Sequence, residues 1–376
     1  MDYNLLMRDE TQKIQRSLRG VSMKTIIDRR GMTRRAFLNT TLAATGVALL
    51  SANAAEAASS RIVFSNWGGS WDRAMRRAWA DPFTKETGIE VVSASDNSLG
   101  RLQAMVESGN IEWDLMEGLP ELARVGAEKG LLEKLDFSII DRNGLMKRPA
   151  FFNDYSIPEV IFGRVMIYDN RLEKKPDSWA SFWDTKNIPG KRAFYNKVES
   201  GILEAALLAD GVPADQLYPL DVDRALKKLG EIRDDIIWYT SVTQSEQVMR
   251  DGQAVMGLLA DGRALNVKNS GAPVDLAMDV GLLTWSVFVI PKGAPNKEAA
   301  MRFLNFVLQV RQQVAVAMEY NYGPVVPAAW KDIPKDRYNL ISGGPNVEKT
   351  GIFLNSDWWA ANLQDATEKF QQWLLG

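Results

Sequence analysis

The residues best suited to bind a charged ligand lie at the ends of two expected strands. Asp261 and Arg263 follow the apolar run at residues 255–259. A guanidinium offers a planar pair of N–H donors to a carboxylate, and an aspartate accepts an ammonium group. A Gly-Gly-Ser turn at residues 68–70, with Gly69 at its centre, precedes an expected helix, where free backbone N–H groups favour an anion. These residue types together are suited to a zwitterion such as an ω-amino acid.

Arg263 also has a simpler interpretation. An arginine at the start of a helix often pairs with a nearby acid on the protein surface, where such ion pairs add little stability. The residue types alone do not separate a ligand contact from a surface pair, so both stay open at this point.

The chemistry of an enzyme has little support in the composition. The sequence contains no cysteine and no histidine. Disulfides, thiolate metal sites and cysteine nucleophiles are therefore excluded, and the commonest general base and metal ligand is missing. We predict no catalytic residue, no cofactor and no metal. A carboxylate-dependent hydrolase stays open as the enzymatic alternative, although no spacing singles out one pair of acids.

The length and net charge further restrict the class of protein to which this chain can belong. The chain has 376 residues, of which 46% are hydrophobic and 24% charged, with a formal net charge of -2. That length exceeds one ordinary hydrophobic core and suits two lobes. Nucleic-acid binding needs a concentrated basic surface, so we expect no nucleic-acid partner.

The start of the chain predicts export. Residues 33–38, Thr-Arg-Arg-Ala-Phe-Leu, match a twin-arginine box, and a modestly apolar run follows at residues 39–50. This run is shorter than the roughly 20 helical residues that span a bilayer. Ala-x-Ala pairs come next, and we favour cleavage after Ala57. A surface basic patch before a core helix is the alternative.

The remaining elements alternate between strands and helices, which favours α/β lobes with parallel strands. Residues 160–168 read as a strand that passes between lobes. We expect strands at residues 61–66, 89–92, 113–116, 192–195, 236–239, 255–259 and 282–290. We expect the longer helices at residues 99–108, 121–129, 202–209, 221–232, 245–251, 297–318 and 358–374. A loop is expected at 320–350.

Several short stretches carry a family resemblance. In order, they are FSNW at 64–67, FTKETGIEV at 83–91, DYSIP at 154–158, SWASFWDTKNIPGK at 178–191, APVDLA at 272–277, PNKEAAMRFLNFVL at 295–308 and YGPVVPAAW at 322–330. The sequence resembles the spermidine/putrescine-binding branch of the periplasmic solute-binding proteins, which serve ABC importers. The resemblance covers almost the whole chain after the export signal.

The resemblance implies two α/β lobes joined by crossing strands, with the ligand in the cleft between them. It implies a monomer that closes around a small molecule and delivers it to the membrane permease of an ABC importer. The expected divisions are a signal and extension at 1–57, lobe I at 58–162 and 262–328, and lobe II at 163–261 and 329–376.

The resemblance also implies ligand contacts. Polyamine binders flank the alkyl chain with aromatic rings and take the ammonium ends with carboxylates. Trp67 matches the aromatic residue of the family's first strand, and Tyr322 matches its late tyrosine. Ser98 lies in the loop after the second strand, which often touches the ligand.

This sequence departs from the family where acids are expected. Arg263 stands where an acid is common, and Ser286, preceded by Trp285, aligns with a family aspartate. A diammonium ligand would lack paired carboxylates, and burying it would be costly. We therefore expect a small amine or zwitterion whose carbon skeleton lies against Trp67 and Trp285. A polyamine is the alternative, followed by a sugar.

Overall fold

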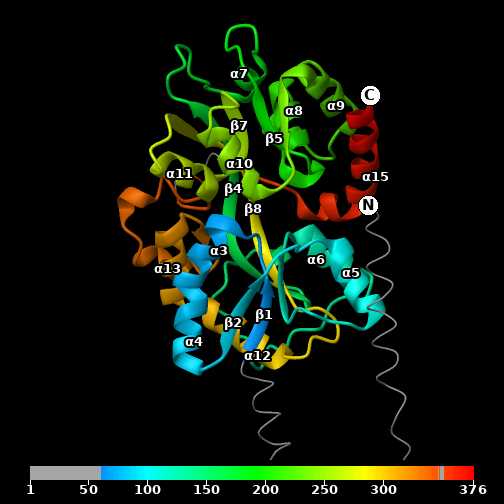
Figure 1. The fold of residues 1–376 in the computed structure, drawn as a ribbon, viewed down its shortest axis with the longest axis vertical. Helices are drawn as coiled ribbons and strands as arrows, with labels where there is room; N and C mark the ends of the chain where they lie inside the picture. The colour runs from blue at the N-terminus through cyan, green and yellow to red at the C-terminus, as the bar shows by residue number, and fades with distance from the viewer. Residues whose placement is uncertain (1–60, 346, 348–350) are drawn as a thin grey trace, which may run out of the picture. The chain divides into compact units, whose positions relative to one another are not determined.

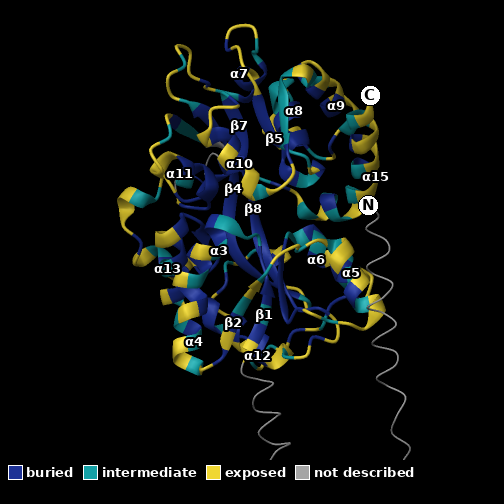
Figure 2. Ribbon diagram, in the orientation of Figure 1, coloured by how far each residue is buried: buried dark blue, intermediate teal, exposed yellow. Residues whose placement is uncertain are grey.

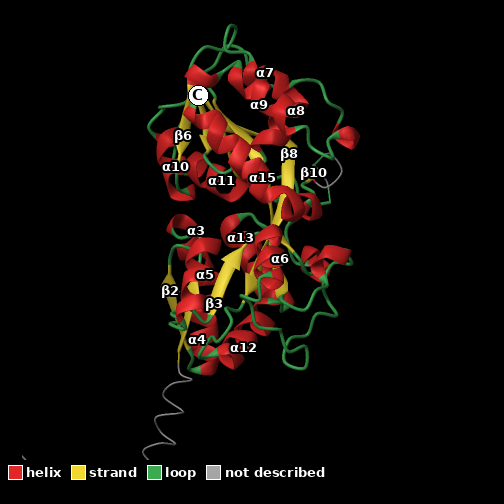
Figure 3. Ribbon diagram, turned by 90° about the vertical axis from the view of Figure 1, so that its right-hand side faces the viewer, coloured by secondary structure: helices red, strands yellow, loops and turns green. Residues whose placement is uncertain are grey.

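The computed structural model describes residues 61–345, 347 and 351–376. The predicted export signal and its cleavage site lie outside these residues. The described chain forms one mixed sheet in the order β2-β1-β3-β8-β4-β7-β5-β6, with β10 beside β8 and β9 beside β4. Helices cover both faces of this sheet (Figure 3).

The first group of elements contains the N-terminal residues and the later helices that pack on them. Its parallel pairs are β1 with β2 and β1 with β3. The elements are β1 (Arg61–Ser65), α3 (Gly69–Met75), a π-helical turn (Arg76–Ala80), α4 (Asp81–Thr87), β2 (Glu90–Ala94), α5 (Leu99–Ser108), β3 (Leu115–Gly118), α6 (Pro120–Glu128), α12 (Lys297–Val307), α13 (Val310–Tyr320) and β9 (Gly323–Pro324).

The second group of elements repeats the strand–helix alternation. Its parallel pairs are β5 with β6 and β5 with β7. The elements are α7 (Trp179–Trp183), β5 (Arg192–Tyr195), α8 (Ile202–Ala209), α9 (Val222–Gly230), β6 (Ile236–Tyr239), α10 (Val242–Arg250), β7 (Met256–Ala260), α11 (Asp261–Asn269), β10 (Ile352–Phe353) and α15 (Ser356–Leu375).

Two long strands connect the groups, β4 (Ser156–Asp169) and β8 (Val274–Val289). They pair antiparallel with each other and run through both groups in Figure 1. Their register shifts twice, between Pro158 and Ile161 and again between Arg164 and Met166. Nearly all of β4 is buried, which explains its almost continuous apolar sequence (Figure 2).

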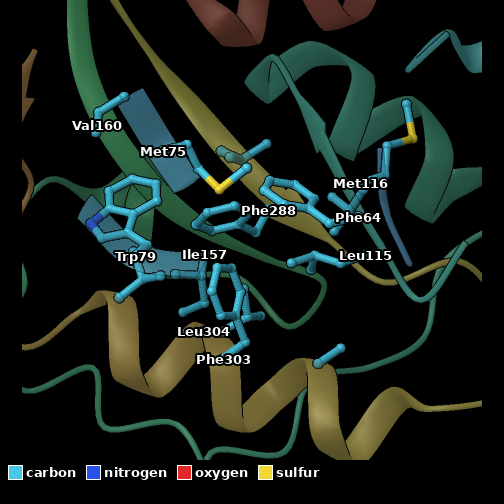
Figure 4. Packing of buried hydrophobic residues seen from close by; sticks show 14 of the residues in the cluster. Phe64, Met75, Trp79, Leu115, Met116, Ile157, Val160, Phe288, Phe303 and Leu304 are labelled. Atoms are coloured by element: carbon cyan, nitrogen blue, oxygen red, sulfur yellow. The ribbon is translucent and has the colours of Figure 1, made fainter. Parts of the chain in front are cut away.

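Each group has its own hydrophobic core. In the first, Phe64, Trp79, Phe288 and Phe303 pack in tilted or edge-to-face contacts between the sheet and α12 (Figure 4). In the second, Phe182, Phe194, Trp359 and Phe370 belong to a separate cluster. Two cores of this kind place one rigid block on each side of the long strands.

The packing differs from the expected lobe boundaries. Ala264 of α11 packs with Val165 of β4, so the segment that follows residue 262 joins the second group and the chain returns within β8. Ile333 and Ile341 pack against Ala317, so this stretch stays with the first group. Both differences have the same cause. The apolar face of a segment, and not the end of the strand before it, determines the hydrophobic core into which the segment packs.

The helix expected at 297–318 is two helices. Gln309 adopts an extended backbone, although no proline or glycine occurs there. The side-chain amide of Gln313 donates to the Val307 carbonyl and its oxygen accepts from the Val325 N–H, at 3.1 and 2.9 Å. These bonds satisfy backbone groups at the break and beside it, and periodicity cannot reveal such contacts.

Candidate ligand-binding site

A cavity with a volume of about 820 Å³ lies at the carboxyl ends of the parallel strands. Its walls are the turns after β1, β2, β3, β5 and β6, together with one face of α15. The lining residues come from segments 66–69, 95–100, 119–122, 195–200, 240–243 and 363–371, and from Arg164. In open α/β sheets this edge is where ligands bind, and small-molecule pockets typically measure about 300–1,000 Å³.

Arg164 is the buried basic residue of the cavity wall. It comes from β4, is 6% exposed, and also lines two smaller cavities beside the large one. Among the described residues, its guanidinium forms no hydrogen bond and no ion pair. Its aromatic neighbour is Phe162, whose ring centroid lies 5.4 Å away. A buried cation without a partner is costly, so an anionic group in the cavity would be strongly favoured.

Three acids line the cavity with Arg164, namely Asp96, Glu121 and Glu199, and the last two also line a smaller cavity together with Arg164. Glu121 lies in the first turn of α6, and Glu199 follows β5. Burial raises the pKa of Glu121 to about 8 and also raises the pKa of Glu199, against the opposing effect of the Arg164 charge. An ammonium group beside these acids would lower both pKa values again. The wall therefore offers a site for each sign of charge.

Four of the predicted residues line a neighbouring cavity of about 30 Å³: Trp67, Arg263, Ser286 and Tyr322. Trp67 lines the large cavity as well, and is half-buried. The Tyr322 ring packs against Trp71 with centroids 5.1 Å apart. A cavity of this volume holds about one water molecule. These residues therefore form the floor of the site, with Trp67 reaching into the main chamber.

Arg263 is in the wall, but its donors are already in use. It is 2% exposed, and Nη1 donates to Glu246 Oε1 at 3.0 Å. Nη2 donates to the carbonyl oxygens of Trp67 and Gly68 at 3.3 and 3.2 Å. Glu246 is buried as well, so Arg263 does not form the surface ion pair of the simpler interpretation. Its guanidinium donors are occupied and are not free to bind a ligand carboxylate in this arrangement.

The partner of Arg263 belongs to a buried polar cluster between α3, α10 and α11. Glu246 accepts hydrogen bonds from Ser70 and from Asn266, and Ser70 also contacts the Tyr320 hydroxyl. Gly69 lies in this contact with φ of +66°, and a Cβ there would stand 2.8 Å from the Thr243 hydroxyl oxygen. The glycine thus permits a close approach, and it lines the large cavity.

Ser98 lines the large cavity, and its hydroxyl caps α5 by accepting from the Arg101 N–H at 3.2 Å. Asp261 and Trp285 line neither the large cavity nor its small neighbour. Asp261 is fully buried, accepts from the Gly262 N–H at 2.9 Å, and burial raises its pKa to about 7. It is not placed to take an ammonium group from the cavity.

Trp285 packs on the opposite side of the sheet. Its ring lies 5.2 Å from Phe151, while its neighbours Thr284 and Ser286 line the cavities. Successive side chains of a strand alternate between faces, so Trp285 and Ser286 cannot both face the ligand. The expectation that Trp285 covers the carbon skeleton is not met in this structure.

Sequence reasoning missed Arg164, Glu121 and Glu199. A signal for Arg164 was present, since it is the one basic residue inside the apolar run 160–168, where a charge is expensive. Glu121 follows Pro120 at a helix start and reads as an ordinary first-turn acid. Its role in the wall depends on the approach of β4, which no local pattern reveals.

Two further observations bear on function. Among the described residues, no group of three or more Asp or Glu side chains is arranged to hold a metal ion. None of the described helices is both long and apolar enough to span a membrane.

Comparisons with known proteins place this chain among relatives of similar length. Residues 78–339 match the family described as bacterial extracellular solute-binding protein. A gamma-aminobutyric acid-binding protein of Pseudomonas aeruginosa is 30% identical over 330 residues, covering 86% of this chain and 93% of that protein. Spermidine/putrescine-binding periplasmic protein 1 of Haemophilus influenzae is 24% identical over 323 residues, covering 81% and 86%.

Solved structures agree with the sequence matches. The binding protein AgtB from A. tumefaciens R10, in complex with agropinic acid, has a TM-score of 0.80 and 29% identity. That alignment covers 84% of this chain and 99% of AgtB. The α/β architecture is therefore shared, over most of both chains, with a protein solved in complex with a small solute.

Proposed function

This chain belongs to the bacterial extracellular solute-binding proteins, and we propose that it captures a small zwitterion in its cavity of about 820 Å³. Membership of this family confirms the predicted two-lobed α/β fold and the prediction that the chain is not an enzyme. The hydrolase alternative is therefore set aside. The proposed ligand carries an amine and a carboxylate, as an ω-amino acid does.

The observation that carries the proposal is the unpartnered guanidinium of Arg164 in a wall that also holds Glu121 and Glu199. A carboxylate on the ligand would give Arg164 the counterion it lacks, through paired N–H donors. The ammonium group would lie toward the acids, whose charged forms burial disfavours until a cation arrives. Trp67 supplies the aromatic surface for the carbon skeleton.

The relatives support an acidic ligand. The Pseudomonas aeruginosa protein is named for gamma-aminobutyric acid, and AgtB was solved with agropinic acid. A polyamine is the second candidate, because Glu121, Glu199 and Asp96 all line the cavity and the Haemophilus influenzae relative is named for polyamines. A polyamine would leave Arg164 without a counterion, which places it second.

Titration calorimetry with 4-aminobutyrate, putrescine and glucose separates these candidates. We expect heat and a defined Kd for 4-aminobutyrate. Tight putrescine binding without a response to 4-aminobutyrate would replace the zwitterion with a polyamine, and a response to glucose alone would favour the sugar alternative. Recovery of each ligand unchanged, checked by mass spectrometry, completes the test of a binding role.

The family and the first residues of the sequence support a proposal for delivery and location. We propose that the protein is exported by the twin-arginine pathway and cleaved after Ala57, and acts as a periplasmic monomer that delivers its ligand to the permease of an ABC importer. No nucleic-acid partner is proposed. Its lobes divide within β4 and β8.

Replacing Arg34 and Arg35 with Lys should leave uncleaved protein in the cytoplasm, which fractionation and immunoblotting would detect. Mature protein outside the membrane would contradict the twin-arginine route.

A further inference from the structure

Two buried carboxyl groups meet beneath the binding site and have no part in the proposed ligand contacts. Glu117 is the penultimate residue of β3, and Glu159 lies on β4, with strand β8 between them. Both residues are 0% exposed. Two isolated carboxylates in such a place would be very costly, so the arrangement needs a physical explanation.

Glu117 holds the turn that carries Trp67. Its Oε1 accepts a hydrogen bond from the indole Nε1 of Trp71 at 2.6 Å, and its Oε2 accepts from the backbone N–H of Trp67 at 2.9 Å. Two donors of this kind favour the ionised form of the acceptor. Trp67 lines the large cavity, and Trp71 packs directly beneath it, so one carboxylate fixes both residues relative to the sheet.

Glu159 has no such donors. Among the described residues, no N–H or O–H reaches either of its carboxyl oxygens with hydrogen-bond geometry. Its polar neighbours are the Glu117 carboxyl and the Ser286 hydroxyl. The register shift between Pro158 and Ile161 surrounds Glu159, and irregularities of this kind turn a side chain out of the normal alternation.

The neighbouring charged groups do not offset the cost of burying two carboxylates. Arg263 from α11 is the cation that acts on Glu117, and Glu159 feels chiefly the Glu117 carboxyl. Burial raises the pKa of both groups, and the neighbouring acid raises the pKa of Glu159 further, well above its usual range. Gln313 of α13 reaches the Glu159 backbone carbonyl rather than its side chain, so it does not change the balance.

We propose that Glu117 and Glu159 share one proton, which Glu159 donates to an ionised Glu117, and that this pair positions the Trp67 turn in the ligand site. A shared proton gives Glu117 a third donor and removes the second buried charge. Glu117 belongs to the first group of elements and Glu159 to the connecting strand β4, so the pair needs no ligand. Only its effect on affinity rests on the proposed function.

The substitution Glu159→Gln tests the shared proton, because an amide donates to Glu117 at every pH. A group with a raised pKa in the folded state contributes stability that is lost as pH rises through that pKa. The free energy of unfolding of the ligand-free wild type should therefore fall with rising pH relative to Glu159→Gln. Glu121 and Asp261 titrate in both proteins, so the difference between the two curves isolates the pair. Parallel curves would overturn the proposal.

Glu117→Gln tests the positioning role and also covers the case in which Glu159→Gln does not fold. Its amide offers one acceptor oxygen where Trp67 and Trp71 require two, so the near-ultraviolet circular dichroism of the tryptophans should change. Removing a charge-assisted hydrogen bond should weaken 4-aminobutyrate binding by about tenfold or more.

These readouts separate the two proposals. If the wild type ignores 4-aminobutyrate, the proposed function fails, while the pH dependence of unfolding and the dichroism still report on the pair. An unchanged tryptophan spectrum in Glu117→Gln would refute the positioning role even if the ligand proposal holds.

Discussion

Arg164 and Arg263 are both buried at the same cavity floor, yet their surroundings differ completely. Arg263 donates to Glu246 and to two backbone carbonyls, whereas Arg164 has no hydrogen bond or ion pair among the described residues. Burial alone therefore does not identify a ligand contact. The informative property is a charge whose partner is missing, because the ligand then supplies what the fold leaves out.

The largest expected effect is at Arg164. Arg164→Ala should weaken 4-aminobutyrate binding by about 30-fold or more, since truncating one side of a buried charge pair costs about 2–5 kcal/mol. Calorimetry measures the loss. Arg302→Ala, at an exposed position on α12, is the matched control and should bind like the wild type. An equal loss for a ligand without a carboxylate would show that Arg164 acts on the fold instead.

The second effect is at Arg263, and its pattern should differ. Arg263→Ala removes donors from Glu246 and from the Trp67 turn, which should cost about 1–3 kcal/mol of unfolding free energy. Binding should weaken by a similar factor for every ligand, because no ligand group is lost. Urea unfolding and calorimetry on the same preparations give both numbers. A loss of affinity confined to ligands with a carboxylate would indicate that Arg263 binds the carboxylate directly.

The third effect concerns Glu121, and its sign follows from the raised pKa. With a pKa of about 8, Glu121 is mostly protonated at pH 7, and its contribution to stability is lost as pH rises toward 8. An ammonium ligand should lower this pKa and release a proton. Calorimetry in buffers of different ionisation enthalpy should detect the release in the wild type. Glu121→Gln should reduce the release, and an unchanged release would place the ammonium elsewhere.

The smallest effect is expected at Trp285. Trp285→Phe keeps an aromatic ring against Phe151 and faces away from the cavity, so the Kd should change by less than about twofold. Thermal unfolding should show a modest loss from the smaller ring. A large loss of affinity with unchanged stability would return Trp285 to the ligand contacts.

The sequence predicted the family, the alternation of elements and three residues that line the large cavity, Trp67, Gly69 and Ser98. Gly69 was predictable because tight turns have local signatures, and Trp67, Ser98 and Tyr322 because the resemblance aligned them. Trp285 was misplaced because an alignment ignores strand alternation. Arg164 was missed because its meaning depends on the absence of a partner, which only the packing of α6, β5 and β4 determines.

The break between α12 and α13 and the packing of α11 were unpredictable for the same reason. Gln313 satisfies backbone groups that lie far apart in the sequence, and Ala264 packs with Val165 and so joins the second group of elements. Local propensity does not register such contacts.

The two register shifts of β4 have a mechanical consequence. They delimit a regular piece of strand from Ile161 to Arg164, and Glu159 lies within the first shift. At about 3.3 Å per residue, the backbone positions of Glu159 and Arg164 are roughly 17 Å apart on the same strand. A displacement of this strand would move the guanidinium and the carboxyl pair together, so ligand binding at Arg164 should change the proton affinity of the pair.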